Sequence, residues 1–145
     1  MKVKPAISKR PKLLRISEEM KQWSAMLEQE LRAWPRVSSR PMFGFIGFYR
    51  ENKIFAGLPR TRALHTSNSI ILKFDPLPPD LLRRAQDDSR IDSARQAPGA
   101  RWYSFDLNSA GDLRDALWWL NQAYLEARNK NPLSAKHRPR PAQDR

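Results

Sequence analysis

An aromatic stretch interrupted by two glycines restricts the fold of this chain more than any other feature. Residues 42–49, Met-Phe-Gly-Phe-Ile-Gly-Phe-Tyr, are rich in side chains that strands favour, and the stretch is too short and glycine-rich for a helix. Residues 53–58, Lys-Ile-Phe-Ala-Gly-Leu, repeat this character after a polar turn at residues 50–52. The two segments therefore predict a β-hairpin.

Two later segments predict further strands. Residues 69–75 alternate apolar side chains on one face, and residues 101–107 carry Trp, Tyr, Phe and Leu. Three prolines follow the first of these strands, and Pro79 fits the first turn of a short helix between the two. Residues 87–100 are polar and predict a loop.

Two longer helices are predicted from apolar residues spaced three and four apart. The first is capped by Ser17 and ends before Pro35, because a residue preceding proline avoids helical geometry. The last begins near Ser109, where Asp112 completes a capping box. Trp118 lies off the apolar stripe of this helix, so we expect its side chain to be exposed.

The predicted elements follow the order α-β-β-β-α-β-α. Successive strands joined by short connections favour antiparallel pairing over parallel pairing. We therefore expect an α+β fold in which a small antiparallel sheet of about four strands carries helices packed on one face.

The net charge of +12 is concentrated near the two ends of the sequence. Residues 1–15 hold six Lys or Arg and no acid, and residues 128–145 hold six against one Asp, whereas residues 16–127 hold 15 against 14 acids. Proline and charge dominate both end segments, which is typical of disorder. We predict a disordered basic tail over 1–15, a folded domain over 16–128 and a disordered, proline-rich basic tail over 129–145.

Composition argues against several classes of function. The chain has no cysteine, and its two histidines, His65 and His137, stand far apart without evident partners. The acidic residues Asp87, Asp88 and Asp92 alternate with arginines, which is typical of a solvated, salt-bridged surface. We expect no catalytic residue, no metal site and no cofactor. The absence of cysteine and of an apolar membrane-spanning run fits a cytoplasmic protein.

Basic residues around the predicted hairpin are the candidate nucleic-acid contacts. The candidates in the domain are Arg50, Lys53, Arg60, Arg62 and Lys73, and those in the N-terminal tail are Lys9, Arg10 and Lys12. Gathered at one end of the sheet, the first five would grip phosphates, with Tyr49 and Trp118 as stacking surfaces. The alternative is an ordinary charged sheet edge, and the nearly neutral composition of residues 16–127 favours this alternative.

The hairpin carries a motif that resembles a known family. The motif residues are Arg40, Met42, Phe43, Gly44, Gly47, Lys53, Phe55 and Ala56. Their arrangement resembles the N-terminal domain of TfoX proteins, which is similar in fold to the MmcQ/YjbR group of small α+β proteins often labelled DNA-binding. Asn52 stands where that family usually has glycine. The resemblance covers about residues 17–127 and implies a bacterial regulatory or binding module rather than an enzyme.

Two functions remain open at this point, and a third, an enzyme acting on a small molecule, has the least support because no polar-lined pocket can be assembled from the sequence. The first is a non-enzymatic module that binds nucleic acid weakly and without sequence preference through its basic tails and hairpin loop. The second is a protein–protein interaction module with no nucleic-acid role. The sequence does not indicate an oligomeric state.

Overall fold

The computed structural model describes residues 13–64, 66–92 and 101–128. Its helices are α2 (Glu18–Arg32), α3 (Pro79–Gln86) and α4 (Leu113–Glu126), the last preceded by the 3-10 turn η1 (Ala110–Asp112). Six strands form the main sheet: β2 (Val37–Met42), β3 (Phe45–Arg50), β4 (Lys53–Pro59), β6 (Ser69–Lys73), β7 (Ile91–Asp92) and β8 (Trp102–Asp106). A separate two-stranded sheet joins β1 (Leu14–Arg15) to β5 (Arg62–Ala63).

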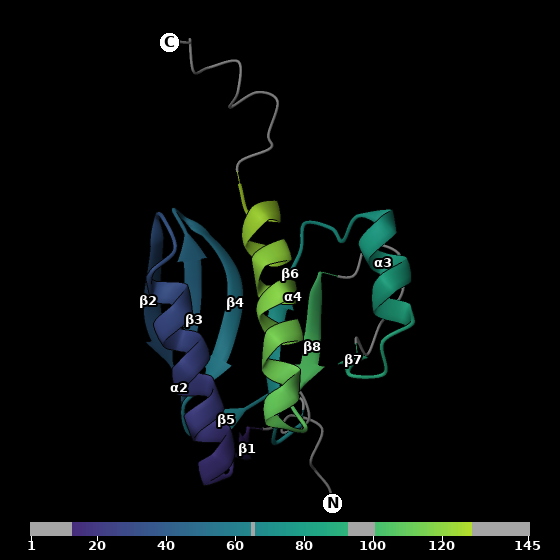
Figure 1. The fold of residues 1–145 in the computed structure, drawn as a ribbon. Coiled ribbons are helices and arrows are strands. Elements are labelled where there is room, and N and C mark those ends of the chain that lie inside the picture. The colour runs from purple at the N-terminus through teal and green to yellow at the C-terminus, as the bar shows by residue number, and fades with distance from the viewer. Residues whose placement is uncertain (1–12, 65, 93–100, 129–145) are drawn as a thin grey trace, which may run out of the picture.

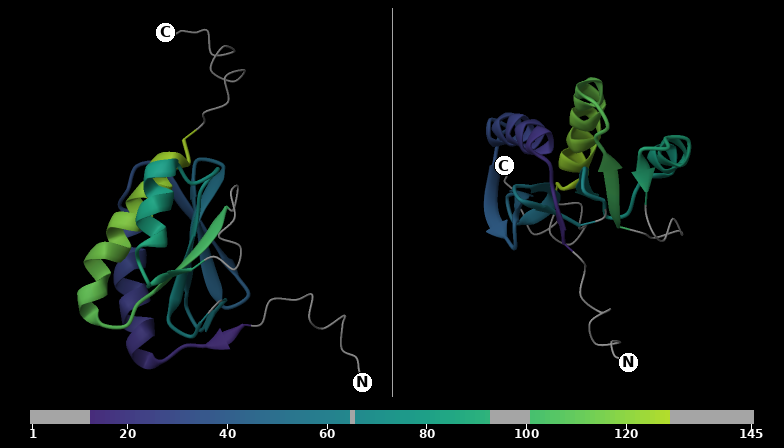
Figure 2. Two further views of the ribbon diagram at one scale, coloured as in Figure 1. Left: turned by 90° about the vertical axis from the view of Figure 1, so that its right-hand side faces the viewer. Right: turned by 90° about the horizontal axis from the view of Figure 1, so that it is seen from below.

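The main sheet has the spatial order β2-β3-β4-β6-β8-β7, and each strand is antiparallel to its neighbours (Figure 1). The three helices lie on one face of this sheet, as the two turned views show (Figure 2). Helix α2 packs on β2 and β4, and α4 packs on β4 and β6. The predicted α+β class and antiparallel sheet are confirmed.

The predicted number and order of strands are wrong. Phe43 and Gly44 adopt positive φ angles of 44° and 91°, so the chain reverses inside the segment predicted as one strand and divides it between β2 and β3. The sequence of β2 is polar and contains Pro41, which an edge strand tolerates because one of its sides has no partner. The two-residue strand β7 lies in the segment predicted as a loop.

The N-terminal boundary of the folded part is also earlier than predicted. Leu14 and Arg15 pair with Ala63 and Arg62, so these two residues belong to the folded part rather than to a disordered tail. Residues 1–12 and 129–145 of the predicted tails lie outside the described residues.

The local signals for helix ends are confirmed. Ser17 Oγ accepts the backbone N–H of Met20 at 3.0 Å and caps α2. Asp112 Oδ2 accepts the backbone N–H of Ser109 at 3.2 Å, as a capping box requires. Pro79 occupies the first turn of α3, where its missing N–H costs no hydrogen bond.

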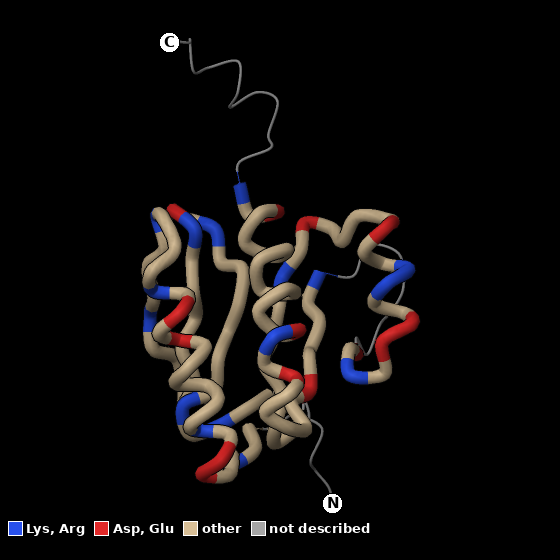
Figure 3. The backbone as a smooth tube through the Cα atoms, in the orientation of Figure 1, with Lys and Arg blue, Asp and Glu red and all other residues tan. Residues whose placement is uncertain are grey.

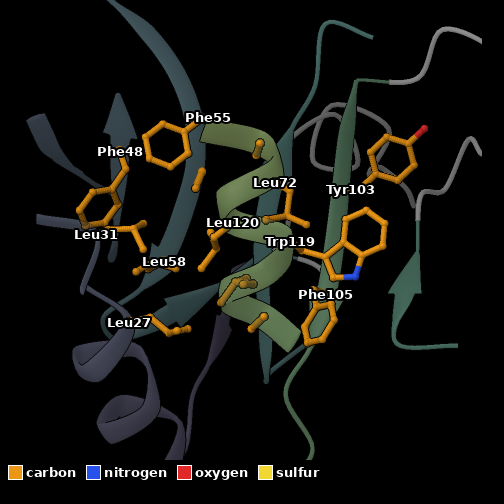
Figure 4. Packing of buried hydrophobic residues seen from close by; sticks show 14 of the residues in the cluster. Leu27, Leu31, Phe48, Phe55, Leu58, Leu72, Tyr103, Phe105, Trp119 and Leu120 are labelled. Carbon is orange, nitrogen blue, oxygen red and sulfur yellow. The ribbon is translucent and has the colours of Figure 1, made fainter. Parts of the chain in front are cut away.

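The hydrophobic core lies between the helices and the sheet (Figure 4). Helix α2 contributes Leu27 and Leu31, and α4 contributes Trp119 and Leu120. The sheet supplies Phe48, Phe55, Leu58, Leu72, Tyr103 and Phe105. Burying large apolar side chains on one face fixes which way each strand faces, because a shift of one residue would turn them outward.

The predicted exposure of Trp118 is wrong. Its side chain is half-buried, with the Arg84 guanidinium carbon 4.3 Å from the ring centroid and the Trp119 ring edge-on at 5.0 Å. Arg84 belongs to α3, so this contact joins α3 to α4. Trp118 is therefore a packing residue and not a free stacking surface.

Candidate functional site

The cations predicted to cluster are divided between the two ends of the main sheet. Lys53 begins β4 and Lys73 ends the antiparallel strand β6, so these two lie at the same end. Arg60 and Arg62 follow the far end of β4, seven and nine residues after Lys53. The predicted single cluster is therefore wrong. Basic and acidic residues also alternate over the fold rather than forming a patch of one sign (Figure 3).

Arg50 and Arg60 are engaged within the fold. Arg50 Nη1 donates to the backbone oxygen of Tyr124 at 2.9 Å, and its guanidinium carbon lies 4.4 Å from the Tyr124 ring centroid. Arg60 Nη2 lies 2.7 Å from Glu28 Oε2, which Arg32 also contacts at 2.8 Å. Burial alone would raise the pKa of Glu28, but the hydrogen bonds from Arg60 and Arg32 outweigh it and hold this pKa below its ordinary value. Arg50 and Arg60 therefore stabilise helix–sheet packing.

Asp75 forms the centre of a cationic cluster just after β6. Its carboxylate lies 3.6 Å from Lys53 Nζ, 3.2 Å from Lys73 Nζ and 3.0 Å from Arg101 Nη1. Burial raises the pKa of Asp75, but hydrogen bonds from Lys73 and Arg101 more than reverse this and lower it. One carboxylate cannot neutralise three cations, so the Asp75 cluster keeps an excess of positive charge at this end of the sheet.

The sheet face opposite the helices, here called the open face, has no described helix over it (Figure 2). At its centre Gly47 of β3 pairs with Gly57 of β4. A Cβ on Gly47 would lie 2.5 Å from Met42 Cε and 3.2 Å from Ile54 Cδ1, and a Cβ on Gly57 would lie 2.8 Å from Ile71 Cγ1. Neighbouring side chains thus fold over the two glycines and form a thin apolar layer.

Two pairs of aromatic and basic side chains flank this apolar layer. On one side the Arg40 guanidinium carbon lies 5.1 Å from the ring centroid of Tyr49. On the other side Lys73 is the cross-strand partner of Trp102, whose side chain is 42% exposed. Lys73 also belongs to the Asp75 cluster, so an accessible indole lies beside the excess positive charge.

The Met-Phe-Gly motif has an unexpected geometry. Phe43 is 83% exposed at a positive φ of 44°, although aromatic residues rarely adopt this region. The next residue holds the turn in place, because the carbonyl oxygen of Gly44 accepts the backbone N–H groups of Arg60, Thr61 and Arg62 at 2.9–3.0 Å. The motif therefore presents an apolar side chain on a fixed turn.

The remaining motif residues divide between the two faces. Arg40, Met42 and Gly47 belong to the open face. Phe55 and Ala56 are both buried, although they are adjacent, because a bulge opposite Phe48 and Tyr49 shifts the register. The bulge also lets the Phe55 ring pack against the rings of Trp34 and Tyr124, with ring centroids 6.3 and 5.5 Å apart.

The remaining sequence candidates lie outside the described residues or take part in ion pairs within the fold. Lys9, Arg10 and Lys12 lie outside the described residues, as does His65. Within the described residues no three His, Cys, Asp or Glu side chains gather in a geometry that could hold a metal ion. Asp88 is instead bound by Arg90 at 2.8 Å, and the same arginine contacts Asp112 at 2.9 Å and Asp115 at 3.0 Å.

Comparison with known proteins gives no further assignment. No protein-family model matches this chain, and no curated protein matches it either. The resemblance to the TfoX N-terminal domain therefore stays a prediction. Among the helices of the described segments, none has both the length and the apolar character needed to cross a membrane.

Sequence reasoning missed the two aromatic–cation pairs of the open face. The signal for Lys73 and Trp102 was present, because both lie on strands that the sequence predicted, but the pairing of residues 29 positions apart depends on the register between β6 and β8. The Arg40–Tyr49 pair could not be found in this way, because Arg40 lies in a strand that was not predicted.

Proposed function

We propose that this chain is a non-enzymatic module that binds nucleic acid, of the regulatory kind that the TfoX resemblance implies. The observation that carries this proposal is the Asp75 cluster, where Lys53, Lys73 and Arg101 surround one carboxylate next to the exposed ring of Trp102. Positive charge beside an accessible aromatic ring suits a ligand that combines phosphates with bases.

The basic end segments supply the long-range part of this binding. They contain most of the net charge of +12, whereas Arg50 and Arg60 are already paired within the fold. Attraction to phosphates is independent of sequence and weakens steeply with salt, because binding releases counterions from the nucleic acid. Binding is therefore weak, tolerant of sequence and dependent on ionic strength.

Titration of nucleic acid at two salt concentrations tests this function. The full chain is compared with a full-length variant in which Lys2, Lys4, Lys9, Arg10 and Lys12 are changed to Gln. The slope of log affinity against log salt should become several units shallower in this variant, by about 0.9 for each duplex DNA phosphate that the variant no longer neutralises. Lys21→Gln, which removes one charge on α2, is the control and should leave the slope almost unchanged. No binding by either protein at low salt would contradict the proposal.

The exposed Phe43 supports a second candidate, a protein-interaction module. A phenyl ring that is 83% exposed on a turn fixed by three hydrogen bonds is suited to insertion into a pocket of another protein. A partner that is retained by the normal chain and by Met26→Ser, but released by Phe43→Ser, would favour this function. Met26 is the matched control because it is 57% exposed on a different element, α2.

A further inference from the structure

We infer that the open face binds unpaired nucleotides, with bases stacking on Tyr49 and Trp102. This inference rests on the proposed nucleic-acid function and specifies the form of nucleic acid that the open face accepts. The shared chemistry is an unstacked base on a phosphate backbone, which single-stranded RNA and single-stranded DNA both offer.

The strand register arranges the relevant side chains in one row. Tyr49 pairs with Ile54 across β3 and β4, and Lys73 pairs with Trp102 across β6 and β8. The pairing of Ala56 with Leu72 places Lys73 next to the β4 residues that precede Ala56, so the two pairs lie at the same level of the sheet. The row crosses four strands, or three spacings of about 4.8 Å, and therefore extends about 14 Å.

Each end of the row combines a ring with a cation. At the β3 end the Arg40 guanidinium lies over Tyr49, and a planar guanidinium can itself stack on a base. At the β8 end Trp102 neighbours Lys73 of the Asp75 cluster. Between them Ile54 and Ile71 are partly exposed and offer apolar contact to bases without a charged group to desolvate.

The charged groups along β6 and β8 favour phosphate binding at the level of the row. Asp106 pairs with Ser69 at the far end of β6 and β8, and its carboxylate accepts the Thr66 hydroxyl at 2.8 Å. On these two strands a phosphate is attracted more strongly to the end that carries Lys73 than to the end that carries Asp106. The rings and cations of the row therefore favour bases that are placed across the strands.

The same geometry disfavours a duplex. In a double helix the base faces are stacked on one another, so rings on a sheet surface reach only phosphates and groove edges. Tyr49 and Trp102 contribute to binding only when a base is free to leave its stack. Stacking on Tyr49 and Trp102 therefore adds affinity for single strands and none for duplexes, whereas the Asp75 cluster and the basic end segments attract both.

Fluorescence anisotropy with labelled 20-nucleotide oligomers tests this inference on the full chain. The probes are oligo(U) RNA, oligo(dT) DNA and a DNA duplex of equal length. Tyr49→Leu and Trp102→Leu should each weaken single-strand binding about tenfold, since stacking contributes about 1–3 kcal/mol per base, and should leave duplex binding unchanged. Phe43→Leu makes the same change to an exposed ring outside the row and is the matched control.

The outcomes separate this inference from the proposed function. The stacking inference would be overturned if the chain bound duplex and single strands with equal affinity. It would also be overturned if neither Tyr49→Leu nor Trp102→Leu weakened single-strand binding. Either result would leave nucleic-acid binding in place. Loss of binding to all three probes at low salt, by a chain whose circular dichroism is normal, would overturn both. An equal loss in Phe43→Leu would also reject the row as the site.

Discussion

The guanidinium of Arg50 joins the end of β3 to the last turn of α4, where its Nη1 donates to the Tyr124 carbonyl oxygen at 2.9 Å. The same group lies 4.4 Å from the Tyr124 ring centroid, so one side chain contacts both the backbone and the ring of one residue. A cation at the C-terminal end of a helix also interacts favourably with the helix dipole. Arg50 therefore belongs to the fold, although its charge and place in a hairpin suggest a phosphate contact.

Replacing Arg50 should lower stability without changing nucleic-acid affinity. Arg50→Gln loses a charged hydrogen bond and a cation–π contact and should reduce the free energy of unfolding by about 2 kcal/mol. Urea denaturation measures this change. Fluorescence anisotropy measures binding in the absence of urea, where the variant is fully folded. Lys21→Gln, an exposed change on α2, should alter stability by less than about 0.5 kcal/mol. Weaker binding by a fully folded Arg50→Gln chain would contradict this prediction and indicate that Arg50 contacts nucleic acid.

The ion pairs of Arg90 should make the free energy of unfolding depend on pH in the acid range. Hydrogen bonds from Arg90, the largest cause, hold the pKa of Asp88 below its ordinary value. A carboxyl group with a lowered folded pKa adds stability above its unfolded pKa of about 4, and this stability is lost as the pH falls through the folded pKa. The urea midpoint should therefore fall as the pH is lowered from about 5 to 2.

The variant Arg90→Gln separates this effect from general acid denaturation. It should lose about 2 kcal/mol at pH 7, because Asp88 and Asp112 keep their charge without their partner. The difference in stability between the normal chain and the variant should shrink toward acid pH as both carboxyl groups take up protons. A difference that stays constant from pH 7 to pH 2 would show that Arg90 acts through packing against the Phe105 ring, whose centroid is 4.8 Å from its guanidinium carbon.

The positive φ at Phe43 predicts a stabilising substitution. Left-handed backbone costs an aromatic residue about 1 kcal/mol or more, whereas asparagine adopts it readily. Because the Phe43 side chain is 83% exposed, its removal sacrifices little buried area. Phe43→Asn should raise the free energy of unfolding by about 1 kcal/mol, and Phe43→Leu, which keeps the strain, should not. A loss of stability in Phe43→Asn would mean that the ring has a packing role.

The two central glycines of the open face should respond differently to alanine. A new Cβ on Gly47 would meet the flexible end of Met42 at 2.5 Å, and Met42 Cε can move away. A Cβ on Gly57 would meet the branched side chain of Ile71 at 2.8 Å and 2.9 Å, where movement is more restricted. We expect Gly57→Ala to cost about 2 kcal/mol and Gly47→Ala less than about 1 kcal/mol, measured by thermal unfolding. The reverse order would mean that Met42 is held more firmly than Ile71.

Local sequence signals predicted the helices of this fold well, because their causes are local. Ser17 caps a helix through its own side chain, and Pro35 limits its length through its neighbour's backbone. Strand β2 gave no comparable signal, since its polar residues are extended only because β3 pairs with them. The half-burial of Trp118 likewise depends on Arg84 from another helix, a contact that helical periodicity does not contain.

The candidate site was predicted only in part for a similar reason. Residue types indicated correctly that Lys73 and Tyr49 lie on the surface of the sheet, but not which cations meet. Lys53 and Arg60 are only seven positions apart in the sequence. Because β4 is extended between them, however, they lie at opposite ends of the sheet. Asp75, which gathers three cations, had no special signal in a sequence rich in isolated acids.

The pairing of β1 with β5 has a consequence for the basic residues that precede it. Lys9, Arg10 and Lys12 are at most five residues from Leu14, so they remain within about 18 Å of this strand in any conformation. Leu14 lies near the end of β4 where β5 begins, and the Asp75 cluster lies at the opposite end, about 23 Å away for a seven-residue strand. A ligand held at one of these places is thereby kept at a high effective concentration near the other. Oligonucleotides long enough to bridge the two should gain affinity through avidity, and shorter ones should bind at one place at a time.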